Sequence, residues 1–264
     1  MLTNVALRPP FAESPLPGPD DLTTIALLLD VDGTILDTAI TPASVVVPDS
    51  LRTLLAVLHV RTGGALALVS GRLIQNLDKL FAPLRLPAVG GHGAEIRLSG
   101  DQATYGRHAD AIGDAFRRLV AAVGAADPRV VVEDKGSSLA VHYRLAPQME
   151  QPLKAKIAAI SRQIPLQDVE IMHGKAVIEI KSSRFNKGVA VGELMQSQPF
   201  LNRKPVFVGD DTTDESVFAL LPKLGGLGYS VGRYMPGANG TFASPQEVRG
   251  WLASLCSRKE PDRP

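Results

Sequence analysis

The sequence predicts an α/β protein with a Rossmann-like parallel-sheet core and an inserted α+β domain, a four-stranded antiparallel sheet with two helices. Two observations lead to this fold class. Towards both ends of the chain, short apolar runs alternate with amphipathic stretches, which is typical of parallel strands covered by helices on both faces. In the middle of the chain, a helix followed by a hairpin pattern occurs twice.

The first part of the core begins with an apolar strand and continues in a strand–helix rhythm. We expect strands over Thr24–Asp30 and Ala65–Val69, and helices over Pro48–Arg61 and Leu73–Phe81. Leucines three and four residues apart give the first of these helices one apolar face.

The rhythm returns near the C-terminus. Helices are predicted over Lys187–Met195, Thr213–Leu221 and Pro245–Leu255, with strands over Pro205–Gly209 and Gly228–Val231. Each strand is short and apolar throughout, as expected for a sheet buried on both faces.

Two hairpins and two helices make up the middle of the chain. Turn-rich residues separate Val130–Asp134 from Leu139–Arg144, and Val169–Met172 from Ala176–Lys181; helices precede them over Asp110–Val123 and Glu150–Ile164. We therefore divide the chain into a Pro-rich leader (1–20), a first core part (21–106), an inserted cap (107–181), a second core part (182–255) and a polar tail (256–264).

Composition excludes several classes of protein. Lys plus Arg number 28 and Asp plus Glu 27, so the net charge of +1 gives no field that would attract nucleic acid or an anionic membrane. No apolar run reaches the ~20 residues of a membrane helix, and the leader lacks the apolar region of a secretory signal. The single cysteine, Cys256, cannot form an intrachain disulfide. We expect a cytoplasmic monomer that binds a small molecule.

The most informative stretch ends the first strand in two carboxylates, Asp30 and Asp32, followed by Gly33. Ligands of open α/β sheets bind at the carboxyl ends of the strands, so both acids are predicted to face the active-site crevice. An Asp-Gly turn is the simpler interpretation. A calcium loop fits less well, because its glycine should stand at position six and here stands at position four.

A second acidic cluster follows the strand at Pro205–Gly209 and contains Asp210, Asp211, Asp214 and Glu215. These acids repel one another unless a cation compensates them, and oxygen-only ligands suit Mg²⁺. Asp214 and Glu215 could instead complement a helix dipole, but that does not explain Asp210 at the strand end.

Two further residues fit a phosphate site. Ser70 lies just after a strand and before a helix start, where backbone N–H groups favour anions, although it could be a plain helix cap. Lys187 begins another helix and could neutralise phosphate oxygens or pair with Asp30, although an isolated helical lysine is usually just solvated.

Together these motifs resemble the haloacid dehalogenase-like phosphatases. The resemblance rests on Asp30-x-Asp32-Gly33-Thr34, Ser70, Lys187 and Gly209-Asp210-Asp211-x-Thr213-Asp214. Within that superfamily, the segments 91–97, 132–136, 140–144 and 174–180 are similar to the trehalose-phosphate phosphatase family. The resemblance covers roughly residues 24–250; one departure is Lys181-Ser182, where the family pattern has Arg-Pro.

The resemblance implies a phosphatase that hydrolyses trehalose 6-phosphate with Mg²⁺. It implies Asp30 as nucleophile, Asp32 as acid and base, and a metal held by the Asp30 carboxylate, the Asp32 carbonyl and Asp210. Asp211 and Asp214 would support the metal. Ser70, Lys187 and the backbone at Gly33 and Thr34 would hold the phosphoryl oxygens.

Strand alternation separates the two faces of the predicted cap sheet. Ile178 and Ile180 share one face, and Glu179 lies on the other. The polar face could be ordinary solvated surface, but the resemblance implies sugar contacts from it, together with two core residues. The expected substrate contacts are Arg72, His92, Glu133, Lys135, His142, Arg144 and Glu179. His92 could equally be a structural histidine in its glycine-rich turn.

Other functions stay open. A related capped phosphatase could act on sucrose phosphate, a mannosyl-phosphoglycerate or a hexose phosphate, and a phosphomutase would return the group to a second hydroxyl. A signalling receiver is shorter and lacks the second acid. A non-catalytic sugar-phosphate-binding regulator would not need a nucleophile beside a proton donor.

Overall fold

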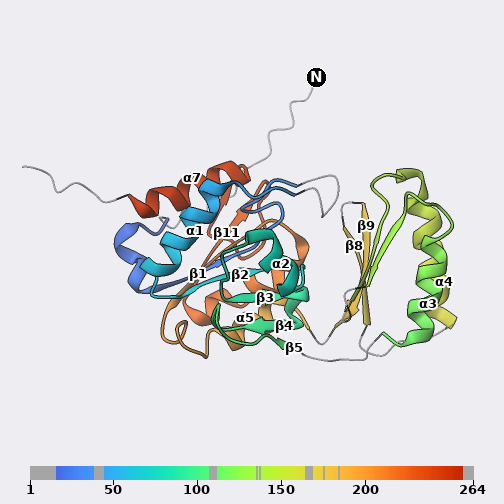
Figure 1. The fold of residues 1–264 in the computed structure, drawn as a ribbon, viewed down its shortest axis with the longest axis horizontal. Helices are drawn as coiled ribbons and strands as arrows, with labels where there is room; N and C mark the ends of the chain where they lie inside the picture. The colour runs from blue at the N-terminus through green and yellow to red at the C-terminus, as the bar shows by residue number, and fades with distance from the viewer. Residues whose placement is uncertain are drawn as a thin grey trace, which may run out of the picture.

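The computed structural model describes residues 16–38, 45–106, 112–134, 136, 138–163, 169–174, 176–183 and 185–257. It contains an eight-stranded core sheet and a separate four-stranded sheet, and Figure 1 shows the two as distinct lobes. This is the predicted fold class. Among the described residues, none of the helices has the length and apolar character needed to cross a lipid bilayer.

The core sheet has the strand order β12-β11-β10-β1-β2-β3-β4-β5. Its strands are β1 (Ile25–Leu29), β2 (Leu66–Val69), β3 (Ala88–Gly90), β4 (Glu95–Arg97), β5 (Tyr105–Gly106), β10 (Lys204–Gly209), β11 (Leu227–Val231) and β12 (Gly240–Phe242). The ladders from β12 to β3 are parallel, and β4 and β5 add an antiparallel edge. The predicted parallel sheet is therefore confirmed, with four short strands that the sequence did not indicate.

Helices cover both faces of this sheet. They are α1 (Asp49–Arg61), α2 (Ile74–Phe81), α5 (Lys187–Leu194), α6 (Glu215–Phe218) and α7 (Pro245–Cys256). Successive residues of β1 enter different clusters: Leu27 packs with residues of α1, α2 and α7, whereas Leu28 packs with residues of α5 and α6. Burial on both faces explains why β1 is apolar at every position.

The cap sheet has the order β6-β7-β9-β8 and is antiparallel throughout. Its elements are α3 (Asp114–Gly124), β6 (Val131–Asp134), β7 (Ser138–His142), α4 (Glu150–Gln163), β8 (Val169–Gly174) and β9 (Val177–Ser182). Figure 1 shows α3 and α4 on the side of this sheet away from the core. Ile178 and Ile180 are buried beneath these helices, so the other face of the sheet is turned towards the core.

The helix predicted over Thr213–Leu221 is wrong in its length. The segment forms a 3-10 turn at Thr212–Asp214, one α-helical turn in α6, and a second 3-10 turn at Leu221–Leu224. Pro222 cannot donate a backbone hydrogen bond, and Gly225 with a φ of 63° ends the segment in a left-handed conformation.

The end of the predicted leader contacts the core. The indole Nε1 of Trp251 in α7 donates a hydrogen bond to the carbonyl oxygen of Pro17 at 3.1 Å, and Leu22 is buried in the turn at Pro19–Thr23. Residues 1–15 and 258–264 lie outside the described residues. The domain boundaries stay predictions.

Candidate active site

The candidate site lies where three neighbouring parallel strands end. Asp30 follows β1, Asp210 follows β10 and Ser70 follows β2, and the sheet order places β1 between the other two. The backbone N–H of Asp30 still bonds the carbonyl oxygen of Val208 in β10 at 2.9 Å. Parallel pairing therefore brings residues about 180 positions apart to one edge of the sheet, as predicted.

Three carboxylates meet at this edge. One oxygen each of Asp30, Asp210 and Asp214 lies within 4.8 Å of the others. Asp30 is 4% exposed and Asp214 is fully buried. Gly33 allows this approach: it has a φ of 86°, and a Cβ at this position would lie 2.1 Å from the Asp210 Oδ2.

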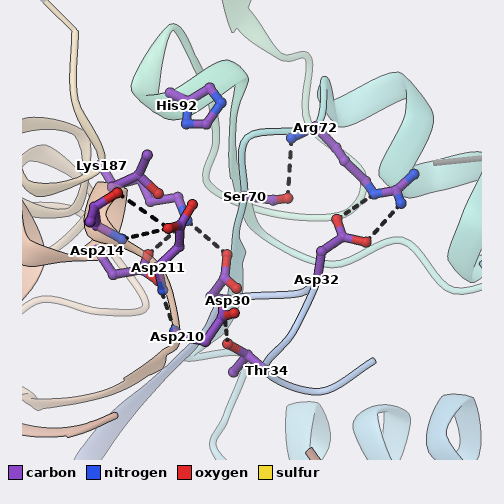
Figure 2. Close-up of polar contacts among 12 residues, drawn as sticks. Asp30, Asp32, Thr34, Ser70, Arg72, His92, Lys187, Asp210, Asp211 and Asp214 are labelled. Carbon is purple, nitrogen blue, oxygen red and sulfur yellow. Dashed lines mark hydrogen bonds and ion pairs between the residues drawn. The ribbon is translucent and has the colours of Figure 1, made fainter. Parts of the chain in front are cut away.

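Lys187 neutralises part of the cluster from the first turn of α5. Its Nζ donates to the Oδ1 of Asp30 and to the Oδ1 of Asp214, both at 2.7 Å (Figure 2). Burial by itself would lower the pKa of Lys187, but the charges of Asp214 and Asp30 raise it above the usual value. The lysine is therefore a buried ammonium held between two carboxylates.

Hydrogen bonds hold Asp214 through both of its carboxylate oxygens. Its Oδ2 accepts from the backbone N–H groups of Asp210 and Asp211 at 3.0 Å, and its Oδ1 accepts from Lys187. Asp214 thus fixes the loop that carries Asp210. Asp211 is exposed and accepts from the N–H of Thr212 at 2.7 Å.

The electrostatics of the cluster fit a divalent cation. Burial raises the pKa of Asp30 well above its usual value; Lys187 opposes that shift, whereas Asp214 and Asp210 add to it. Burial, then the charges of Asp214 and Asp211, raise the pKa of Asp210 to about 6. Three carboxylates face one ammonium, and an oxygen-only donor set of this kind is suited to a hard cation.

Asp32 lies in a second group of residues beside this cluster. Its carboxylate receives two hydrogen bonds from Arg72, Nε to Oδ2 at 2.6 Å and Nη2 to Oδ1 at 2.7 Å. Figure 2 shows Asp30 directed towards Lys187 and Asp32 directed towards Arg72, with Ser70 drawn between Asp30 and Arg72. The Thr34 hydroxyl donates a hydrogen bond from Oγ1 to Asp210 Oδ1 at 3.4 Å.

Ser70 is buried, and its Oγ accepts from the N–H of Arg72 at 3.1 Å. Ser70 is not the cap of α2, because that helix begins at Ile74 after Leu73. The N–H of Ile74 is instead satisfied by the Oε2 of Glu95 at 2.7 Å. Ser70 therefore stabilises the turn from which Arg72 projects.

The cap contacts the core through a pair of candidate substrate residues. Glu179 of β9 lies 2.9 Å from the Nε2 of His92, and these side chains are 14% and 8% exposed. His92 stands in the 3-10 turn at Gly91–Gly93 with a φ of 55°. Its ring packs on Gly71, where a Cβ would lie 2.4 Å from two ring atoms.

Two of the remaining cap candidates, Glu133 and His142, lie on the sheet face turned towards the core. His142 Nε2 lies 3.1 Å from Glu133 Oε2, and Arg144 follows β7. Burial would lower the pKa of Arg72 in the core, but the hydrogen bond and charge of Asp32 raise it above the usual value, and the negative charge of Glu133 adds to that rise. Lys135 lies outside the described residues.

Sequence reasoning missed two supporting residues. Asn186 caps α5 by accepting from the N–H of Val189 at 2.8 Å, and its position just before a predicted helix was a usable signal. Glu95 caps α2 from β4, 21 residues away along the chain, and no local pattern indicates such a contact.

Removal of the buried ammonium should destabilise the protein in a pH-dependent way. In the presence of a chelator, we expect Lys187→Met to lower the free energy of unfolding by about 3–5 kcal/mol near pH 8, and by less near pH 5. Without Lys187 the pKa of folded Asp30 rises further, so the folded state retains a proton that the unfolded state releases, and stability falls as pH rises.

Denaturant unfolding at both pH values measures this effect. Lys154→Met, which removes a surface partner of Glu150, is the control and should behave like the unmodified protein. Equal losses for Lys187→Met at the two pH values would contradict the assignment.

Comparisons with known proteins agree with this geometry. A family model described as Trehalose-phosphatase matches residues 28–241. A probable trehalose-phosphate phosphatase of Sinorhizobium fredii is 42% identical over 241 residues, with 89% of each chain covered. The trehalose-6-phosphate phosphatase of Escherichia coli is 37% identical over 238 residues, which cover 90% of this chain and 89% of that protein.

A solved structure shares the fold. The C-terminal domain of a C. albicans trehalose-6-phosphate phosphatase aligns with a TM-score of 0.76 at 22% identity, over 90% of this chain and 94% of that one. The family match spans most of the chain, and its first residue lies in β1. The chain belongs to the trehalose-phosphatase family and is a phosphoric monoester hydrolase.

Proposed function

We propose that this protein is a Mg²⁺-dependent phosphatase that hydrolyses trehalose 6-phosphate to trehalose and phosphate through an aspartyl-phosphate on Asp30. The observation that carries the proposal is the buried Asp30 at the end of β1, with Lys187 Nζ at 2.7 Å and the carboxylate of Asp210 beside it. A carboxylate nucleophile needs such compensation, because an anionic phosphate repels it.

The Asp30 and Asp210 side chains and the backbone carbonyl of Asp32 would hold Mg²⁺. When bound, the cation neutralises charge on the phosphoryl oxygens and on the attacking carboxylate. Asp214 supports this arrangement indirectly, since it fixes the Asp210 backbone and Lys187. Asp211 would act from outside the direct ligands.

The reaction then proceeds in two balanced steps. In the first, an Asp30 oxygen forms a bond to phosphorus, the bond from phosphorus to the sugar oxygen breaks, and Asp32 gives a proton to that oxygen. In the second, a water oxygen bonds to phosphorus, Asp32 takes a proton from this water, and the bond between phosphorus and Asp30 breaks. Phosphate leaves, and both aspartates return to their starting state.

Hydrogen-bond donors around Asp30 would position the phosphoryl group. Ser70 Oγ and Lys187 Nζ can each donate to its oxygens. The backbone N–H groups of Gly33 and Thr34 donate to the carbonyl oxygens of Leu36 at 2.8 Å and Val31 at 3.4 Å, so they would have to exchange these partners for the phosphoryl oxygens. Such donors stabilise the charge that spreads over these oxygens in the transition state.

Selection of the sugar falls to the cap. The polar face of its sheet carries Glu133, His142 and Glu179, and Arg144 follows β7. The contact of Glu179 with His92 supports a position of this face over the core site. Lys135 is proposed as a further sugar contact from the sequence alone. Carboxylates, imidazoles and guanidinium groups together can pair many sugar hydroxyls. A site built to form these hydrogen bonds rejects compounds that lack the hydroxyls.

The nucleophile is tested by Asp30→Asn. An amide of nearly the same size preserves the packing but cannot form the aspartyl-phosphate, so phosphate release from trehalose 6-phosphate should fall by about a thousandfold or more. Asp37→Asn, an exposed partner of Arg249 in the same loop, is the matched control and should retain its activity. Full turnover by Asp30→Asn, or turnover of the unmodified enzyme that survives chelation, would refute the proposed mechanism.

The role of the cap is tested by Glu133→Ala with two substrates. The KM for trehalose 6-phosphate should rise about tenfold, the equivalent of one charged hydrogen bond, while hydrolysis of a small aryl phosphate should be spared. Glu170→Ala, an exposed cap partner of Lys181, is the control and should change neither. Equal losses on both substrates would argue against a role for Glu133 in sugar recognition.

A further inference from the structure

Arg72 forms an ion pair with Asp32, the residue that the proposed mechanism uses as proton donor and acceptor. Its guanidinium forms two hydrogen bonds to Asp32, at 2.6 and 2.7 Å, and these engage both carboxylate oxygens. A fork of this kind is among the strongest and most directional contacts between side chains. A catalytic acid must bring an oxygen within hydrogen-bond distance of the reacting oxygen. Because the fork directs both Asp32 oxygens towards Arg72, we expect Asp32 to give up part of this contact before one of them reaches the reacting oxygen.

We propose that Arg72 is a positioning residue that holds Asp32 turned away from the reaction centre until the cap closes on a sugar phosphate. On closure, the guanidinium exchanges the Asp32 carboxylate for the cap carboxylate Glu133, and the released Asp32 carboxylate takes a proton from solvent water, which it then gives to the leaving sugar oxygen. This inference rests on the proposed function, since it assigns a controlling residue to the same site. It makes Arg72 a determinant of specificity in place of the direct substrate contact that the sequence predicted.

The backbone of Arg72 is fixed at both of its polar groups. Its N–H donates to Ser70 Oγ at 3.1 Å, and its carbonyl oxygen accepts from the N–H of Gly91 at 2.9 Å. A Cβ at Gly90 would lie 2.9 Å from the same carbonyl oxygen, so the two segments pack closely. The base of the Arg72 side chain therefore stays in place, and only the guanidinium and its partner can move.

Asp32 has the freedom to move that Asp30 lacks. The Asp32 side chain is 36% exposed, whereas that of Asp30 is 6% exposed and is held by Lys187. Figure 2 shows the Asp30 carboxylate directed towards Lys187 and the Asp32 carboxylate directed towards Arg72. Rotation of Asp32 away from Arg72 leaves the Asp30 cluster undisturbed.

The cap supplies an alternative partner for the guanidinium. Glu133 lies on the polar face of the cap sheet, which is turned towards the core, and its Oε2 lies 3.1 Å from His142 Nε2. Its negative charge also acts on Arg72, whose side chain is only 15% exposed. Movement of the cap towards the core strengthens this interaction, because it brings a second carboxylate to a poorly solvated cation. A phosphate ester too small to engage the cap leaves Arg72 on Asp32. The exchange thus links the availability of Asp32 to the presence of the sugar.

Arg72→Met tests the inference, with glycerol phosphate and trehalose 6-phosphate as substrates. Glycerol phosphate has no sugar to engage the cap, and its alkoxide leaving group needs a proton. Because Asp32 is no longer held, kcat for glycerol phosphate should rise about three- to tenfold, the scale of one lost charge-assisted contact. Turnover of trehalose 6-phosphate should not rise, so discrimination between the substrates should fall. Arg72→Lys, which can engage only one oxygen at a time, should lie between the two.

Arg129→Met, which removes an exposed arginine paired with Asp127 in the cap, is the control and should change neither substrate. An unchanged or lower kcat for glycerol phosphate in Arg72→Met would overturn the inference. Should that variant fail to fold, a crystal structure of Asp30→Asn with trehalose 6-phosphate gives the answer: Asp32 still bonded to Arg72 beneath a closed cap would overturn the exchange. An active Asp30→Asn refutes the proposed function itself, whereas these results concern Arg72 alone.

Discussion

The structure depends on one buried ammonium, Lys187, held at 2.7 Å from both Asp30 and Asp214. Carboxylates rarely share a buried site, because desolvation and mutual repulsion both oppose their ionised forms. Here the lysine compensates two of them and leaves the cluster short of positive charge. The negative charge that remains uncompensated suits the site to bind a divalent cation, and a bound cation in turn stabilises an anionic substrate.

The topology of the core sheet brings the acidic residues and Lys187 together at one edge of the sheet. Asp30 after β1, Lys187 of α5 and the acids after β10 meet because β10 and β1 pair in parallel with their carboxyl ends together. Two glycines permit the close approach: a Cβ at Gly33 would overlap Asp210, and a Cβ at Gly209 would lie 2.5 Å from Asp214 Oδ2. The cluster is thus a product of both backbone conformation and charge.

Much of this could be predicted from sequence, because strong local patterns specify it. The continuous apolar run of β1 indicated a strand buried on both faces, and the alternation around Ile178 and Ile180 correctly indicated the apolar face of the cap sheet. Two-residue and three-residue strands such as β5 and β12 carry too few side chains for a period to show. The helix predicted over Thr213–Leu221 is wrong because the segment divides into a 3-10 turn, a single α-helical turn and a second 3-10 turn that contains Pro222 and ends at the left-handed Gly225.

The contacts between individual side chains were harder to predict from the sequence. Motif spacing indicated that Asp32 and Arg72 belong near one site, but not that they bind each other across 40 residues. Their contact depends on how the ends of β1 and β2 are staggered, which no periodicity encodes. The roles of the individual site residues stay proposals, since geometry brings the groups together without showing the reaction.

The most direct test is a calorimetric titration of the chelator-treated protein with Mg²⁺ at neutral pH. We expect a single binding site whose affinity for Mg²⁺ falls about tenfold or more in Asp30→Asn and in Asp210→Asn, and stays unchanged in Asp37→Asn. Mg²⁺ binding that is indifferent to both Asp30 and Asp210, or no binding by the unmodified protein, would contradict this expectation.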